Sequence, residues 1–178
     1  MSDRVLARFT AATGLEVEVL RAGDAGSMVN QAVLTAGNPV ADVLFGLDNT
    51  FLSRALEADL FLAYESPALA RLIPGLALDP EYRVTPIDFG DVCLNYDKTA
   101  FDGTQPPQTL ADLADPAYRG MLVVQDPATS SPGLAFLLAT IATFGESGDY
   151  TWLDYWADLR ANDVQVTSGW EEAYYGAF

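Results

Sequence analysis

Two turns of this sequence combine carboxylate, hydroxyl and glycine residues directly before a helical pattern. The turn GDAGS contains Asp24, Gly26 and Ser27, and the turn DPATSSPG contains Ser130 and Ser131. Free backbone N–H groups at a helix N-terminus, together with hydroxyl groups, can hold a phosphate or a carboxylate. Ordinary helix capping explains the same residue types. Both turns are therefore candidate binding sites for an anionic or amide group.

A third turn, TSGWEEAYYGAF, brings aromatic residues next to polar ones. Trp170 and Tyr174 are four positions apart and share one face of a helix. Such a face can stack on a flat heterocycle or surround a cation, and core packing is the alternative explanation. Asp48 lies in a similar position, because the apolar run ADVLF and Gly46 precede it.

The residue types argue against an enzyme and against a metal site. Histidine is absent, which removes histidine-based catalysis and histidine-based metal binding. Cys93, the only cysteine, lies in an apolar run and is expected to be a buried small hydrophobic residue. Asp88 and Asp91 are three apart on an extended stretch, so they should face opposite ways and form no pair. We therefore predict no catalytic residue, no metal site and no cofactor.

Composition limits the partners. The chain has 178 residues, half of them hydrophobic, and a formal net charge of −16. This charge argues against nucleic acid, which needs clustered lysine and arginine. No apolar run reaches the roughly 20 residues of a membrane-spanning helix. The first ten residues, MSDRVLARFT, lack the apolar segment of a signal peptide.

Alternating strand and helix patterns must position these turns. We expect helices at residues 3–13, 27–35, 50–58, 133–144 and 149–161, and strands at residues 15–20, 41–45, 121–125 and 164–167. This order predicts an α/β fold with parallel strands, whose carboxyl ends are where ligands bind. The first helix has no strand before it, and the last helical pattern runs to residue 178. We therefore expect a fold that is incomplete at both ends.

The extended pattern of residues 84–96 divides the chain. It is long enough to cross from one lobe to another, with Gly90 in its middle. We therefore expect residues 1–85 to form part of a first lobe, residues 86–98 to form a crossing hinge and residues 99–178 to form part of a second lobe.

Taken together, these segments resemble the extracytoplasmic thiamine-binding proteins of ABC importers, a branch of the two-lobed (type II) periplasmic solute-binding proteins. The resemblance covers most of the chain from residue 15 onward. The segments that carry it are ADVLFGLDNTFL (41–52), PIDFGDVCLNYDK (86–98), PPQTLADL (106–113), QDPATSSPGLAFLL (125–138) and VTSGWEEAYYGAF (166–178).

The resemblance implies a periplasmic or cell-surface protein that binds thiamine or a thiamine phosphate between its lobes and delivers it to an ABC permease. It implies that the turn containing Asp24, Gly26 and Ser27, together with Ser130, faces the phosphate or hydroxyethyl end. Trp170 matches a ligand contact of the family, and Tyr174 lies on the same helical face. It also implies that the sequence is a fragment, because the family pattern has a first strand and a second half beyond it.

Among the remaining predicted site residues, Asp48 falls at the cleft edge and Ser131 follows Ser130 in the second turn. Two alternatives stay open. One is a binding protein for another small solute, such as ferric iron or a polyamine, for which the pair Tyr174-Tyr175 offers phenolate ligands. The other is a hydrolase that uses carboxylates such as Asp48, although no nucleophile–base pair supports it.

Overall fold

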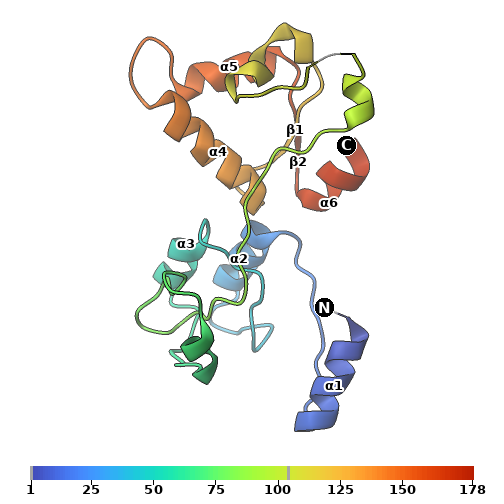
Figure 1. The fold of residues 1–178 in the computed structure, drawn as a ribbon. Coiled ribbons are helices and arrows are strands. Elements are labelled where there is room, and N and C mark those ends of the chain that lie inside the picture. Colours follow the sequence, from blue (N-terminus) through green and yellow to red (C-terminus); the bar gives the residue numbers. More distant parts are fainter. Residues whose placement is uncertain (1, 104) are drawn as a thin grey trace.

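The computed structural model describes residues 2–103 and 105–178 of the chain. Two groups of elements lie one above the other, as Figure 1 shows. The helices and strands, in chain order, are α1 (Asp3–Thr13), α2 (Ala25–Leu34), α3 (Leu52–Glu57), β1 (Val123–Gln125), α4 (Ser131–Phe144), α5 (Trp152–Ala161), β2 (Gln165–Thr167) and α6 (Trp170–Glu172). Short 3-10 turns occur at Pro67–Arg71, Lys98–Phe101, Ala111–Ala114 and Pro116–Tyr118, and a π-helical turn, Ala173–Ala177, continues α6.

The upper group in Figure 1 is built on the parallel pair β1 and β2. The register pairs Val124 with Val166, and α4 packs against β1 and α5. A core of five buried side chains lies between these elements: Leu113, Val124, Phe136, Tyr155 and Leu159. Burial of such apolar surface is the main term that holds the strands and helices together. The sequence patterns for β1, α4, α5 and β2 are confirmed here.

Tyr155 anchors this core. Its side chain is 0% exposed, and its ring stacks on Phe144 with centroids 4.2 Å apart. Its hydroxyl donates to the backbone oxygen of Leu110 at 2.5 Å. At the start of α5, the N–H and hydroxyl of Thr151 both donate to Asp154, a capping box that fixes where the helix begins. The polar end of the tyrosine therefore ties the 110–114 turn to α5.

The lower group contains α2 and α3, whose shared core consists of Val29, Phe51 and Ala55. The expected helices are confirmed within a few residues, because their apolar periodicity has a partner to pack against. The helix α1 forms as expected but buries no residue. In Figure 1 it extends away from α2 and α3.

The expected strands at residues 15–20 and 41–45 are wrong. Both segments are irregular in the structure, and their apolar side chains are largely exposed: Val19 is 52% and Val43 80% exposed. A strand needs a neighbouring strand for its backbone hydrogen bonds, and no described segment pairs with either one. The described residues therefore contain a sheet, β1 with β2, in the upper group alone.

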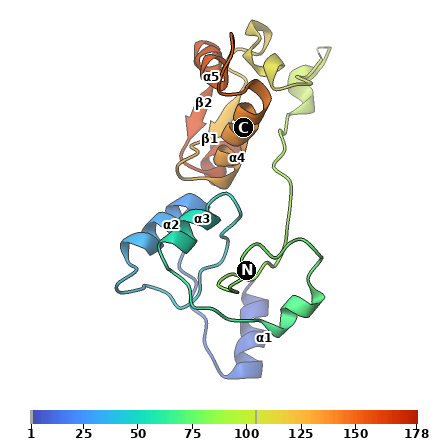
Figure 2. The ribbon, with the colours of Figure 1, turned by 90° about the vertical axis from the view of Figure 1, so that its left-hand side faces the viewer.

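The chain between the two groups is extended. Residues 85–97 contain no helix or strand, and Figure 2 shows this stretch running from the lower group to the upper one. Cys93, expected to be buried, is exposed, because no described residue packs closely over this part of the extended segment. The assignment of residues 86–98 as a hinge between two lobes stays a prediction.

Candidate functional site

The turn between β1 and α4 is held by its own carboxylate. Asp126 accepts from the N–H of Ala128 at 2.8 Å, and its backbone oxygen accepts from the N–H groups of Thr129 and Ser130. The backbone N–H of Asp126 donates to Thr167 at 2.8 Å. The turn is therefore fixed to the end of β2, and the start of α4 is placed beside the start of α6.

The turn between β2 and α6 positions the aromatic residues. Glu172 accepts from the hydroxyl of Ser168 at 2.7 Å and from its N–H at 2.9 Å. The first of these bonds, aided by the second, lowers the pKa of Glu172. A charged carboxylate in the first turn suits the positive end of a helix. These bonds hold the turn that precedes α6, whose first residue is Trp170.

Three aromatic rings form a ladder along α6 and the π-helical turn. The rings of Trp170 and Tyr174 stack with centroids 4.8 Å apart and planes 11° apart. Phe178 continues the ladder, with its ring 5.4 Å from that of Tyr174. The shared face predicted for Trp170 and Tyr174 is therefore present. Phe178 was not predicted, although its spacing of four from Tyr174 carried the same signal.

Asp24 brings the three predicted turns together. Its carboxylate accepts from the hydroxyl of Ser130 at 2.5 Å and from the backbone N–H of Trp170 at 2.8 Å. The N–H of Ser27 donates to Thr129 at 3.2 Å. We call this contact, made of Asp24, Gly26, Ser27, Thr129, Ser130 and Gly169, the junction. It joins the start of α2 to the starts of α4 and α6.

The junction is closely packed. A Cβ on Gly26 would lie 2.6 Å from the ring of Phe51 and 2.8 Å from the backbone of Thr129. A Cβ on Gly169 would lie 3.1 Å from Asp24 Oδ2. Glycine is therefore needed at position 26 for the two backbones to approach, and a side chain at position 169 would press on the Asp24 carboxylate.

An open cavity of about 2340 Å³ lies beside the junction. Of the predicted site residues, Asp48, Ser131, Trp170 and Tyr174 line it. The other four, Asp24, Gly26, Ser27 and Ser130, lie in the junction and outside the cavity lining. Their role as ligand contacts stays a prediction.

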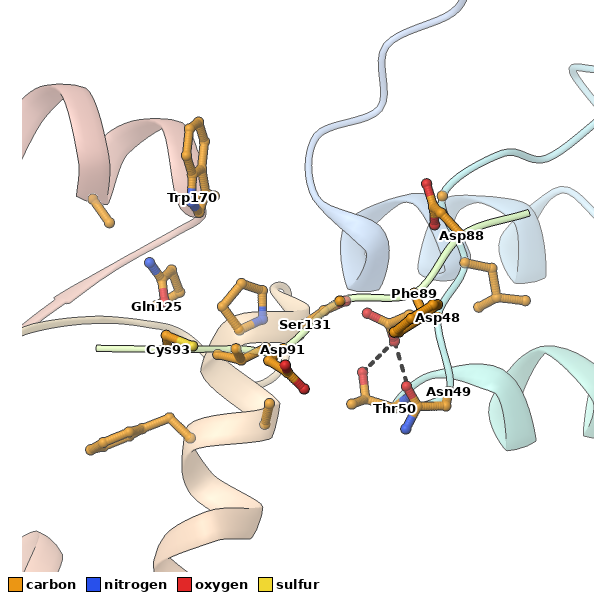
Figure 3. A pocket seen from close by; sticks show the side chains of 18 of the residues that line it. Asp48, Asn49, Thr50, Asp88, Phe89, Asp91, Cys93, Gln125, Ser131 and Trp170 are labelled. Atoms are coloured by element: carbon orange, nitrogen blue, oxygen red, sulfur yellow. Dashed lines mark hydrogen bonds between the residues drawn. The ribbon is translucent and has the colours of Figure 1, made fainter. Parts of the chain in front are cut away.

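Figure 3 shows the lining from close by, with Trp170 and Gln125 on one side and Asp48 and Asp88 on the other. Asp48 accepts from the N–H of Thr50 at 2.9 Å and from its hydroxyl at 2.6 Å, which fixes the carboxylate at the edge of the cavity. Gln125 was not predicted as a site residue, although it ends the strand β1. The end of a parallel strand is the signal that could have found it.

The lining is acidic. It contains five aspartates, Asp42, Asp48, Asp88, Asp91 and Asp97, and one basic side chain, Arg83. The guanidinium of Arg83 is bound to Asp79 at 2.9 Å. The hydrogen bond from this side chain, stronger than the opposing effect of burial, lowers the pKa of Asp79 to about 2. The cavity therefore presents negative charge to a ligand, and its one guanidinium already has a partner.

Ser131 offers a polar group at the start of α4. Its hydroxyl oxygen is buried and finds no hydrogen-bond partner among the described residues. A buried hydroxyl without a partner is costly, so a ligand atom that bonded to it would gain that energy.

Metal-ligand clusters and membrane-spanning helices are both absent from the described residues. Within residues 2–103 and 105–178, no group of three or more His, Cys, Asp or Glu residues is placed to hold a metal ion. In the same residues, no helix has both the length and the hydropathy of a membrane span.

Comparison with known proteins gives a consistent result. The thiamine-binding periplasmic proteins of Salmonella typhimurium and Escherichia coli are each 32% identical over 166 residues, which is 93% of this chain and 48% of theirs. Iron uptake protein A1 of Synechocystis is 24% identical, over 92% of this chain and 44% of its own. The chain thus spans about half the length of the curated relatives it matches.

A solved structure, described as a periplasmic thiamin binding protein, superposes with a TM-score of 0.73 and 29% sequence identity. The superposition covers 96% of this chain and 51% of the chain in the solved structure. The match confirms that the chain has part of the α/β fold of two-lobed periplasmic binding proteins. Residues 38–174 match the family described as bacterial extracellular solute-binding protein. This chain therefore belongs to the bacterial extracellular solute-binding proteins, a family of binding proteins that act outside the cytoplasm.

Proposed function

We propose that this protein binds thiamine or a thiamine phosphate in the cavity and delivers it to the permease of an ABC importer. Residues 1–85 and 99–178 belong to two lobes, and residues 86–98 are the hinge about which they close on the ligand. The names of the relatives, thiamine-binding periplasmic protein, support this ligand class.

The observation that carries the proposal is an aromatic ladder and a set of carboxylates lining one cavity. Thiamine joins a flat aminopyrimidine to a thiazolium ring with a permanent positive charge. A flat ring stacks on an aromatic face, and a cation is attracted both by π faces and by carboxylates. The ladder beginning at Trp170 supplies the faces, and Asp48 and Asp91 supply the charge.

The remaining polar groups suit the other end of the ligand. The unpartnered hydroxyl of Ser131 and the N–H groups at the start of α4 can donate to a hydroxyl or phosphate oxygen. In this arrangement the aromatic wall holds the rings, Asp48 faces the positive charge, and α4 receives the ligand's tail.

Calorimetry with the 178-residue chain tests the proposal, using thiamine, thiamine monophosphate, spermidine and ferric citrate as separate ligands. We expect Trp170→Ala to weaken thiamine binding by about 30- to 100-fold, the size of effect found when a central aromatic contact is removed. Trp152→Ala is the matched control, because Trp152 also begins a helix but does not line the cavity.

Absence of heat with thiamine and with its phosphate would refute the ligand. Binding of ferric ion that survives Trp170→Ala would favour the iron alternative. Release of phosphate from thiamine monophosphate by the purified chain would favour a hydrolase.

A further inference from the structure

The carboxylate of Asp24 does not cap its own helix. Asp24 is the N-cap residue of α2, but its side chain makes no capping hydrogen bond to α2. An aspartate at this position ordinarily accepts from N–H groups of the helix that follows it. Here the same oxygen, Oδ2, accepts from Ser130 and from Trp170. The capping group of α2 is therefore used by two other helices.

Ser130 shows the same departure. It is the N-cap residue of α4, it is 0% exposed, and its side chain does not cap α4. Its hydroxyl donates to Asp24 instead, across 106 positions of sequence. Hydrogen bonds to a charged group are stronger than neutral ones, and one inside a buried contact is hard to replace by water. The Asp24 carboxylate is thus the polar centre of the junction.

The contact with Trp170 reaches the cavity. The backbone N–H of Trp170 is one of the first N–H groups of α6, which have no partner inside the helix. By accepting a hydrogen bond from this N–H, Asp24 fixes where α6 begins. The side chain of the same residue, Trp170, lines the cavity. Tyr174 and Phe178 stack in line with Trp170, so Trp170 is the ring of the ladder nearest to this contact.

We infer that Asp24 is a positioning residue: it acts on ligand binding through Trp170, and it does not touch the ligand in the cavity. Asp24 belongs to the lower group of elements and Trp170 to the upper one. A carboxylate at the start of α2 in one group therefore positions an aromatic side chain in the other group. The expected effect on ligand affinity rests on the proposed function. The effect on the placement of Trp170 does not depend on any ligand.

The first test needs no ligand. Backbone hydrogen exchange is measured for the Trp170 amide in the native chain and in Asp24→Ala, with Asp24→Asn as the conservative variant. We expect the protection of this amide to fall at least tenfold in Asp24→Ala, the equivalent of about 1.4 kcal/mol, since the lost bond is to a charged acceptor. Asp24→Asn keeps an acceptor oxygen and should retain most of the protection.

Ser130→Ala is the matched control within the junction. It removes the other hydrogen bond to Asp24 and leaves the one to Trp170, so protection of the Trp170 amide should change much less than in Asp24→Ala. Equal losses in the two variants would mean a general loosening of the junction and would overturn the inference. Asp149→Asn, at an exposed aspartate, controls for the loss of one negative charge.

The second test is a double-mutant cycle on thiamine affinity, with Asp24→Ala made in the native chain and in Trp170→Ala. We expect Asp24→Ala to weaken binding by about tenfold in the native chain and by less than about twofold when the indole is absent. Equal losses in both backgrounds would overturn the inference, because Asp24 would then act without Trp170. If the native chain binds no thiamine, the proposed function fails and the exchange experiment still decides the role of Asp24.

Discussion

At Gly133, a single contact decides whether a substitution by alanine raises or lowers the free energy of unfolding. It is the third residue of α4 and is buried. A Cβ at this position would overlap the carbonyl oxygen of Gln125 and lie 2.7 Å from its carbonyl carbon. Both atoms are backbone, so no side chain can rotate away. The helix or the strand must move by at least about 0.7 Å, which brings that carbon to the ordinary contact distance of 3.4 Å, and by more to relieve the contact with the oxygen.

In a helix free of such a contact, Gly→Ala stabilises by about 0.5–1 kcal/mol. Overpacking typically costs about 1–3 kcal/mol. We therefore expect Gly133→Ala to lower the free energy of unfolding by about 1 kcal/mol and the Tm by about 2–4 °C, for a chain of this size. This change in stability is opposite in sign to that of Gly→Ala at a helical position where the new Cβ makes no close contact.

Urea and thermal unfolding measure the effect, with Gly176→Ala as control. Gly176 is also in a helical turn, but a Cβ there would meet nothing within 4 Å. The control should be neutral or slightly stabilising. A Gly133→Ala variant as stable as the control would refute the steric argument, and with it the close seating of α4 against the end of β1.

Two further predictions concern buried polar contacts. Asp79, held by Arg83, has a pKa of about 2 in the folded chain against 3.8 for the free group, so its stabilising contribution is present above about pH 4 and is lost as the pH falls toward 2. Asp79→Asn should therefore be less stable than the native chain at pH 7, and urea unfolding should show the difference shrinking below pH 4; a difference independent of pH would contradict this. Tyr155→Phe removes the donor to Leu110 and should cost about 1 kcal/mol in urea unfolding. Tyr175→Phe, whose side chain is 76% exposed, should cost nothing measurable.

The parts of the fold that the sequence predicted correctly are segments that pack against another segment of the same chain. The apolar helix pattern of residues 133–144 and the short apolar run of residues 121–125 pack against each other in the structure as α4 and β1. Residues 15–20 and 41–45 have equally clear strand patterns and form no strand. The alternation of residues 15–20 and the apolar run of residues 41–45 indicate which faces of a strand would be buried, but neither pattern supplies a neighbouring strand to complete the backbone hydrogen bonds.

For the site too, local spacing was predictable from the sequence and long-range contacts were not. The spacing of Trp170 and Tyr174 predicted a shared face, and their rings stack. Helix capping was one explanation of both turns, and Asp24 and Ser130 occupy the N-cap positions of α2 and α4, although neither side chain caps its helix. That their side chains bond to each other could not be read from the sequence, since 106 positions separate them and only the packing of α2 against the start of α4 brings them together.

The acidic lining and the aromatic ladder act over different ranges. At physiological ionic strength a carboxylate is felt over about 8 Å, whereas stacking begins only when rings touch. If the ligand is a cation, as proposed, the five aspartates of the lining govern how often it arrives, and contact with the ladder governs how long it stays. A neutral molecule of the same flat shape would lose the fast arrival and the cation–π attraction, and would keep only the contact between the flat rings.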